Sequence, residues 1–155
     1  IMVFDTVTTP PPVAAPDIDV RRITDPDDLR DVIDVLDQVW ETDHSWINYH
    51  LGDELRTNPD YLSVYVAYAD GQPVSCAWIM FDGSQFASLW GGSTVRGYRG
   101  RGIYTTLLAV RMAEARTRGK RFLTVDASPM SRPILERYGF VRISTAYPCK
   151  WRMKG

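Results

Sequence analysis

The sequence is poor in the residues that hold metals or form disulfides. Of its 155 residues, only two are cysteine and two are histidine. Neither Cys76 nor Cys149 belongs to a CxxC motif or a Cys/His cluster. His44 and His50 are six residues apart, which fits neither an HExxH motif nor a zinc finger. We therefore expect no metal site, and two buried, reduced thiols in a cytoplasmic protein.

Long apolar runs and a strong net charge are also missing. No apolar run approaches the roughly 20 residues of a membrane helix, and no basic-then-apolar leader is visible. The chain begins with Ile, so anything upstream stays out of view. A pI near 6.1 argues against a dedicated nucleic-acid binder. We expect no membrane and no nucleic acid among its partners.

The near-neutral charge hides an asymmetry between the two parts of the chain. Residues 1–60 have 14 acidic and four basic side chains, a net charge of −10. Residues 61–155 have five acidic and 14 basic side chains, a net charge of +9. Such polarity is typical of a protein that handles a cation on one side and an anion on the other.

The pattern of residues predicts two parts, 1–16 and 17–155. The first is a short strand at 1–7 followed by a linker with four prolines. In the second, alternation predicts a strand at 17–24, and β-branched and aromatic residues predict strands at 62–68 and 74–81, joined by a hairpin at Asp70-Gly71. Further strands are predicted at 86–95 and 122–126 and in the tail to Met153. Apolar stripes and end signals predict helices at 25–40, 45–56, 102–118 and 131–138. The order β-α-α-β-β-β-α-β-α-β predicts a mixed α/β domain whose three middle strands form an antiparallel meander.

The junction before the third helix is rich in glycine and arginine. It reads Arg96-Gly97-Tyr98-Arg99-Gly100-Arg101-Gly102. Its glycines permit left-handed backbone, and the helix that follows offers unpaired N–H groups at the positive end of its dipole. A P-loop would need GxxxxGK and then Ser or Thr, and a dinucleotide fingerprint would need a third glycine. The junction therefore predicts a different kind of anion site.

Two motifs resemble those of the GNAT superfamily of N-acyltransferases. The first is the family's cofactor motif, Arg/Gln-x-x-Gly-x-Gly/Ala, which Arg99–Tyr104 matches except at its last position. The second is a short helix that ends in Gly-Phe, here residues 131–140. The element order also resembles the family from about residue 17 to residue 153. The resemblance implies a GNAT-like mixed sheet and an enzyme that uses acetyl-CoA.

The resemblance also implies where the cofactor lies. The strand before the loop would pair with the pantetheine arm like an added β-strand, and the loop and helix start would hold the pyrophosphate. That strand and strand 122–126 would splay apart to admit the thioester. The residues implied are Gly92, Ser93 and Thr94 on the strand, and Arg99, Gly100, Arg101, Gly102, Ile103, Tyr104 and Thr105 at the loop.

Three positions depart from the family's pattern. Tyr104 replaces the last small residue of the motif, and we expect its ring to turn into the core. Ser128 stands where the family often has asparagine. Leu135 stands where the family often has a tyrosine that acts as general acid, and Tyr138 is expected to pack. The general acid would then be Ser128, Ser131 or a water, or the reaction would proceed without a dedicated acid.

The acceptor side is expected near the two-helix region. Its acidic and aromatic side chains suit a cationic amine through charge and cation–π contact. Because histidine titrates near neutrality, His44 is a candidate base. Asp126 is a second candidate, and Ser128 completes the catalytic set.

We therefore predict acetyl transfer from acetyl-CoA to a primary amine, expected to be a small cationic molecule, by direct attack. Two alternatives stay open: a protein or peptide N-acetyltransferase, and a non-catalytic acyl-CoA-binding or regulatory domain. Dimerisation is frequent among proteins of this kind, which leaves a homodimer open as well.

Overall fold

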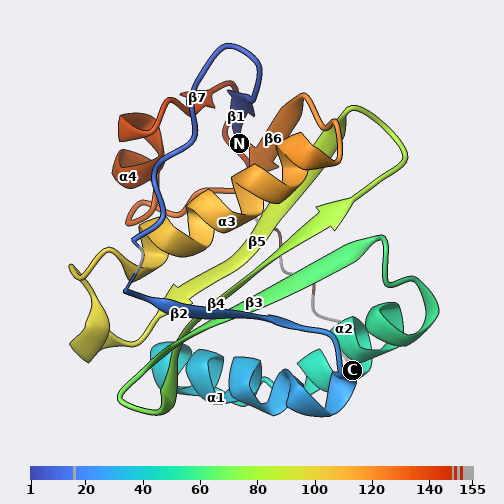
Figure 1. The fold of residues 1–155 in the computed structure, drawn as a ribbon, viewed down its shortest axis with the longest axis vertical. Helices are drawn as coiled ribbons and strands as arrows, with labels where there is room; N and C mark the ends of the chain where they lie inside the picture. The colour runs from blue at the N-terminus through green and yellow to red at the C-terminus, as the bar shows by residue number, and fades with distance from the viewer. Residues whose placement is uncertain (16, 148, 150, 152–155) are drawn as a thin grey trace.

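A seven-stranded mixed sheet forms the centre of the fold (Figure 1). The computed structural model describes residues 1–15, 17–147, 149 and 151. The strands are β1 (Met2–Asp5), β2 (Asp19–Ile23), β3 (Leu62–Ala69), β4 (Gln72–Phe81), β5 (Phe86–Thr94), β6 (Phe122–Val125) and β7 (Val141–Arg142). The helices are α1 (Leu29–Trp40), α2 (Trp46–Thr57), α3 (Ile103–Thr117) and α4 (Arg132–Arg137). The sheet order is β2-β3-β4-β5-β6-β1-β7, and the predicted mixed α/β fold is confirmed.

The predicted antiparallel meander is β3-β4-β5. Its first turn is made by Asp70 and Gly71, whose φ angles of 54° and 74° match a hairpin turn with the twist of the flanking strands. β2 extends the meander by pairing antiparallel with β3. The chain then crosses over through α3, so β6 runs parallel to β5.

The two ends of the chain meet at the other side of the sheet. β1 lies between β6 and β7 and pairs antiparallel with both. The predicted strand in the tail is wrong in length, because β7 ends at Arg142 and residues 143–147 form no strand. Its partner β1 begins at Met2, so the chain runs past its partner after Arg142. Most of the predicted strand beyond residue 147 lies outside the described residues.

Helices cover both faces of the sheet (Figure 1). α1 and α2 pack on one face, where their apolar stripes meet β3 and β4. α3 packs on the opposite face, together with α4 and the apolar side of β1. Burial of these apolar faces supplies the main stabilisation of such a layered domain. In the described part of the chain, no helix is long and apolar enough to cross a membrane.

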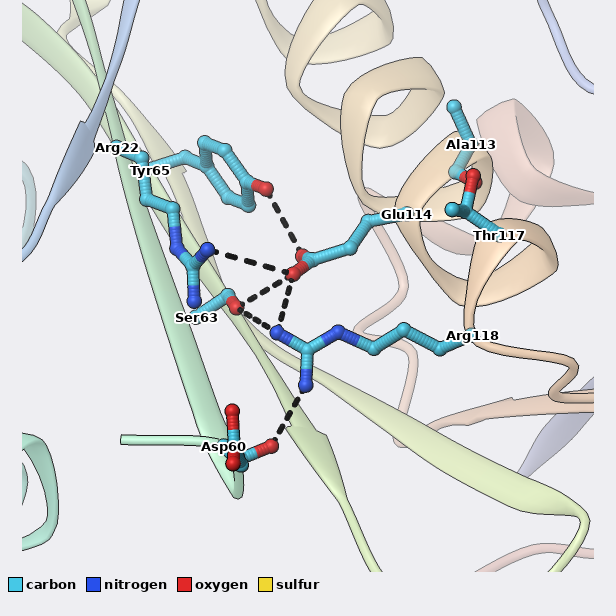
Figure 2. Close-up of polar contacts among 8 residues, drawn as sticks. All are labelled: Arg22, Asp60, Ser63, Tyr65, Ala113, Glu114, Thr117 and Arg118. Atoms are coloured by element: carbon cyan, nitrogen blue, oxygen red, sulfur yellow. Dashed lines mark hydrogen bonds and ion pairs between the residues drawn. The ribbon is translucent and has the colours of Figure 1, made fainter. Parts of the chain in front are cut away.

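A carboxylate near the end of α3 fixes this helix to the sheet (Figure 2). Glu114 accepts hydrogen bonds of 2.8 Å from Ser63 Oγ, Tyr65 Oη and Arg118 Nη2. Arg118 also donates to the carbonyl of Asp60 at 2.7 Å. Ser63 and Tyr65 belong to β3, so the network sets the position of α3 across the meander and leaves its other end free for the glycine-rich loop.

Candidate active site

The central feature of the site is the divergence of two parallel strands. β5 and β6 pair from Phe86↔Phe122 to Leu89↔Val125, and no further pair joins them among the described residues. A cavity of about 710 Å³ opens where they separate. It is lined by side chains from both faces of the sheet, so it passes through the gap between the strands.

A bulge starts the divergence. The β4–β5 register shifts between Cys76 and Trp78, and Gly91 opposite has a φ of 65°. A Cβ atom on Gly91 would stand 1.8 Å from the ring of Trp78. Only glycine meets both demands at this point, because the backbone is left-handed and the indole ring fills the place of a side chain.

The glycine-rich loop brings the start of α3 to one end of the cavity. Gly100 and Gly102 have φ angles of 77° and 79°, and Gly102 caps the helix. Its carbonyl accepts the N–H of Thr106 at 2.9 Å. The N–H groups of residues 103–105 precede this first helical bond and are therefore donors without an intrahelical acceptor. Together with the helix dipole they make an anion site.

Two arginines of the loop have different roles in the structure. Arg99 lines the cavity and donates from Nε to the carbonyl of Thr94 at 2.9 Å, which ties the loop to the end of β5. Arg101 does not line the cavity. Its guanidinium lies over the ring of Tyr98, 5.0 Å from the centroid. The other predicted cofactor residues all line the cavity: Gly92, Ser93, Thr94, Gly100, Gly102, Ile103, Tyr104 and Thr105.

The end of β5 lines this space beyond its last pair with β6. Ser93 Oγ accepts a hydrogen bond of 3.2 Å from Trp40 Nε1, which links the strand to the end of α1. Ser75 on β4 donates to the carbonyl of Ser93 at 2.6 Å and lies 2.8 Å from Thr94 Oγ1. These contacts hold β5 in position where it has lost β6 as a neighbour.

Tyr104, the bulky residue at the motif's last position, lies against Gly92. A Cβ atom on Gly92 would stand 3.0 Å from Tyr104 Cε2. The expectation that Tyr104 turns into the core describes only part of its environment, because the residue is half-buried and lines the cavity. Burial raises the pKa of its phenol. Gly92 makes room for the larger ring.

His44, a predicted catalytic residue, lines the cavity on the α1–α2 side. Its Nδ1 lies 2.9 Å from Asp37 Oδ1 and 2.8 Å from the carbonyl of Thr42. Both partners are acceptors, so Nδ1 carries the hydrogen and Nε2 is the unprotonated nitrogen of the neutral ring. The backbone N–H of His44 also donates to Asp37 Oδ1 at 2.9 Å. Asp37 therefore fixes both the position and the tautomer of a potential base.

The other predicted catalytic residues lie across the cavity, after β6. Asp126 and Ser128 both line it, and Asp126 is exposed. Ser128 Oγ lies 3.2 Å from Ser131 Oγ and accepts the backbone N–H of Ser131 at the same distance. Leu135, at the family's tyrosine position, is fully buried. Tyr138 packs against the core as expected, but it also lines the cavity, with its Oη 3.4 Å from Thr105 Oγ1.

Sequence reasoning missed four residues that shape the site. Asp37 stands seven residues before His44, across a helix end, and its spacing gives no signal. Trp40 belongs to the apolar stripe of α1, which predicts a core residue, yet its side chain is 53% exposed and lines the cavity. Arg137 lines the cavity from the end of α4. Arg111 lies within the apolar stripe of α3, where a charged residue was itself a signal.

Tryptophan rings surround the mouth of the cavity on the α1–α2 side. Trp40, Trp46 and Trp90 all line it and are 53%, 55% and 44% exposed. Acidic side chains of α1 lie on the same side of the sheet. Exposed aromatic faces next to carboxylates suit a cationic ligand. Among the described residues, no group of three or more His, Cys, Asp or Glu could hold a metal ion.

The chain matches the family model described as the acetyltransferase (GNAT) domain, over residues 13–128. No curated protein matches it at a significant level.

Several solved structures share the fold. A predicted acetyltransferase from Clostridium acetobutylicum, solved with acetyl-CoA, is 19% identical with a TM-score of 0.70, and the match covers 86% of this chain and 96% of that one. Glucosamine-6-phosphate N-acetyltransferase from Arabidopsis thaliana is 15% identical with a TM-score of 0.73, covering 87% and 99%. An aminoglycoside acetyltransferase from an uncultured soil metagenomic sample, in complex with sisomicin, is 15% identical with a TM-score of 0.70, covering 88% and 97%.

Proposed function

Because the chain belongs to the GNAT acetyltransferase family, we propose that it transfers an acetyl group from acetyl-CoA to the primary amine of a small cationic molecule. We further propose that the amine attacks the thioester directly. The observation that carries this proposal is His44, which Asp37 holds in the cavity where β5 and β6 diverge. One cavity thus holds a candidate base, a free strand edge and a helix N-terminus.

The donor side of the cavity fits an acyl-CoA. The edge of β5 at residues 92–94 offers backbone groups for an extended pantetheine arm, as an added strand would use them. The N–H groups at residues 103–105 suit a pyrophosphate, and Arg99 and Arg137 add positive charge beside them. Acetyl-CoA supplies the activated acetyl group, and the protein supplies its position.

The acceptor side fits a cationic amine. Trp40, Trp46 and Trp90 present aromatic faces, and Asp37 and Glu41 lie at the adjoining end of α1. An ammonium ion is attracted here, but it must lose a proton before it can attack. The unprotonated Nε2 of His44 would remove that proton, a role that the contacts of Nδ1 with two acceptors support.

The leaving side has hydroxyl groups in place of the family's tyrosine. Leu135 offers no proton, whereas the Ser128–Ser131 pair lies at the edge of the same cavity. A CoA thiolate is a fair leaving group, so a weak hydroxyl donor or a water suffices here. Asp126 is exposed and lacks a fixed partner among the described residues, and we therefore rank it below His44 as the base.

A second candidate function is the acetylation of a protein or peptide. The acidic residues along α1 favour it, since they would attract a basic peptide. A series of amines of increasing size, up to a lysine-rich peptide, separates the two functions by kcat/KM. The non-catalytic alternative predicts binding of acetyl-CoA with no turnover of any amine in this series.

The test combines calorimetry with an assay of thiol release. We expect acetyl-CoA binding that is weakened in an Arg99→Ala/Arg101→Ala double variant. His44→Gln should lower kcat by about 10²- to 10³-fold, which is the usual contribution of a general base, with little change in acetyl-CoA affinity. Asp37→Asn should lower kcat about tenfold, because it weakens the hydrogen bond that holds Nδ1 of His44.

His50→Gln is the matched control, because His50 is exposed and does not line the cavity. It should retain wild-type kcat. Full activity in His44→Gln would remove His44 as the base. Absence of acetyl-CoA binding in the wild type would refute the proposed function altogether.

Cytoplasmic location and a homodimer stay predictions. The first rests on the free cysteines Cys76 and Cys149, and the second on resemblance alone.

A further inference from the structure

A buried arginine lies in the wall of the cavity on the α3 side. Arg111 is only 2% exposed, yet it lines the cavity. Its Nε donates to the carbonyl of Leu107 at 3.0 Å. Its Nη1 donates to the carbonyls of Trp78 and Trp90 at 3.3 and 3.4 Å. These contacts place the guanidinium beside β4 and β5, next to the bulge where the strands diverge.

The charge of Arg111 is not neutralised by any described residue. No carboxylate in the described part of the chain lies within 4.0 Å of its guanidinium. Nη2 donates no hydrogen bond to a described residue. Burial lowers the pKa of Arg111 to about 10, which leaves it charged at neutral pH. A buried cation without a counter-ion is costly, so an anion bound in the cavity would stabilise the protein at this point.

A second polar side chain of α3 also lines the cavity. Tyr104 stands seven residues before Arg111, two helical turns away on the same side of α3. The phenol donates no hydrogen bond to a described residue. A guanidinium and a phenol are both donors, and an anion between them would satisfy both.

Support of the bulge explains only part of this arrangement. The carbonyls of Trp78 and Trp90 need donors where the ladder is interrupted, and Nη1 supplies them. A neutral donor would meet that need without burying a charge. Neither Nη2 nor the Tyr104 phenol contributes to it.

We propose that Arg111 and Tyr104 form a carboxylate-binding subsite for the far end of the acyl group, so that the enzyme also accepts a short dicarboxylic acyl-CoA, such as malonyl- or succinyl-CoA, and binds it more tightly than acetyl-CoA. The location favours the acyl donor over the amine. Both residues belong to α3, on the same face as the glycine-rich loop, whereas His44 lies on the α1–α2 face. The inference rests on the proposed function.

The chemistry is that of acetyl transfer with a longer acyl group. The amine nitrogen forms a bond to the thioester carbon, and the C–S bond breaks. His44 takes one proton from the ammonium ion before attack, and the second proton of the nitrogen passes through a water or a serine hydroxyl to the departing sulfur, so that CoA leaves as the thiol. The product is an amide whose free carboxylate remains against Arg111 until release, so no oxidant or further reactant is needed.

The test compares acyl-CoAs by calorimetry. Acetyl-, malonyl- and succinyl-CoA are titrated into the wild type, Arg111→Met, Arg111→Lys and Tyr104→Phe. We expect the wild type to bind one of the two carboxylated donors about ten- to a hundredfold more tightly than acetyl-CoA. Arg111→Met should lose this preference while it still binds acetyl-CoA, and Arg111→Lys should keep part of it.

Tyr104→Phe is a second variant that should fold, because it removes only one oxygen atom and keeps the contact between the ring and Gly92. If Arg111→Met does not fold, as judged by circular dichroism, a several-fold loss of preference in Tyr104→Phe supports the subsite. Equal or tighter binding of acetyl-CoA by the wild type would overturn it.

Thiol release with amines that have or lack a carboxylate distinguishes the two sources of the anion. An Arg111-dependent preference for a carboxylated amine, without any preference among donors, would overturn the assignment to the acyl group. Failure of every acyl-CoA to bind would instead refute the proposed function itself.

Discussion

Replacement of Gly91 by alanine should destabilise the protein markedly, because the alanine would have an unfavourable backbone conformation and its Cβ atom would clash with Trp78. The backbone at Gly91 is left-handed, with a φ of 65°, which costs an alanine about 1–2 kcal/mol. The added Cβ would also stand 1.8, 2.2 and 2.3 Å from three atoms of the Trp78 ring. Overpacking of this kind costs about 1–3 kcal/mol once the neighbours shift. Together these effects predict a loss of about 2–5 kcal/mol in the free energy of unfolding.

Urea unfolding, followed by tryptophan fluorescence and by circular dichroism, measures this loss for Gly91→Ala. A Trp78→Leu background separates the two costs. Without the indole ring the steric part should vanish, so Gly91→Ala should then cost only the backbone part, about 1–2 kcal/mol. Gly71→Ala is a control with a similar φ of 74° and no atom within 4 Å of its added Cβ. If Gly91→Ala costs no more than Gly71→Ala, the close approach of Trp78 does not govern the bulge.

Two further predictions concern the scaffold and its thiols. Glu114→Gln should lower the free energy of unfolding by about 1–3 kcal/mol, because it weakens the largely buried hydrogen bonds to Ser63, Tyr65 and Arg118. Glu136→Gln, in the exposed ion pair with Arg132, should change it by less than about 0.5 kcal/mol. Equal effects of the two substitutions would contradict this role for Glu114. Burial raises the pKa of Cys76 to about 12, whereas Cys149 is exposed. In the folded protein at pH 8, Cys149 should therefore react with a thiol reagent, and Cys76 should react only after unfolding. Rapid reaction of both thiols in the folded protein would contradict this.

The fold could be predicted in outline because its signals are local. β-Branched and aromatic residues mark the first two meander strands, and Asp70-Gly71 marks the hairpin between them. The glycine-rich loop before α3 is likewise a contiguous segment. The pairing of β1 with β6 could not be predicted, because a single sequence carries no signal for pairing between strands more than a hundred residues apart. The length of β7 depends on that same pairing.

The candidate site follows from the family resemblance where it consists of contiguous segments, and it was missed where it depends on distant side chains. The resemblance pointed to residues 92–94 and to the glycine-rich loop, and these segments lie at one cavity; their binding of the cofactor stays a prediction. The Asp37–His44 pair depends on the sharp end of α1, where Glu41 has a left-handed φ of 53° that reverses the chain. The role of Arg111 depends on a bulge in β5, which its position in α3 does not indicate.

The acidic and basic parts of the sequence lie mainly on opposite faces of the sheet. The acidic half builds α1 and α2 on one face of the sheet, and the basic half builds the loop and α3 on the other. The diverging strands connect the two faces through one cavity. In the mechanism that we propose, His44 becomes positive when it accepts a proton, and it would do so beside Asp37 on the acidic face. Negative charge on the departing thiolate would develop on the side that holds Arg99 and Arg111. On this proposal the sheet separates the two charges that amide formation creates, and each arises near protein charge of the opposite sign.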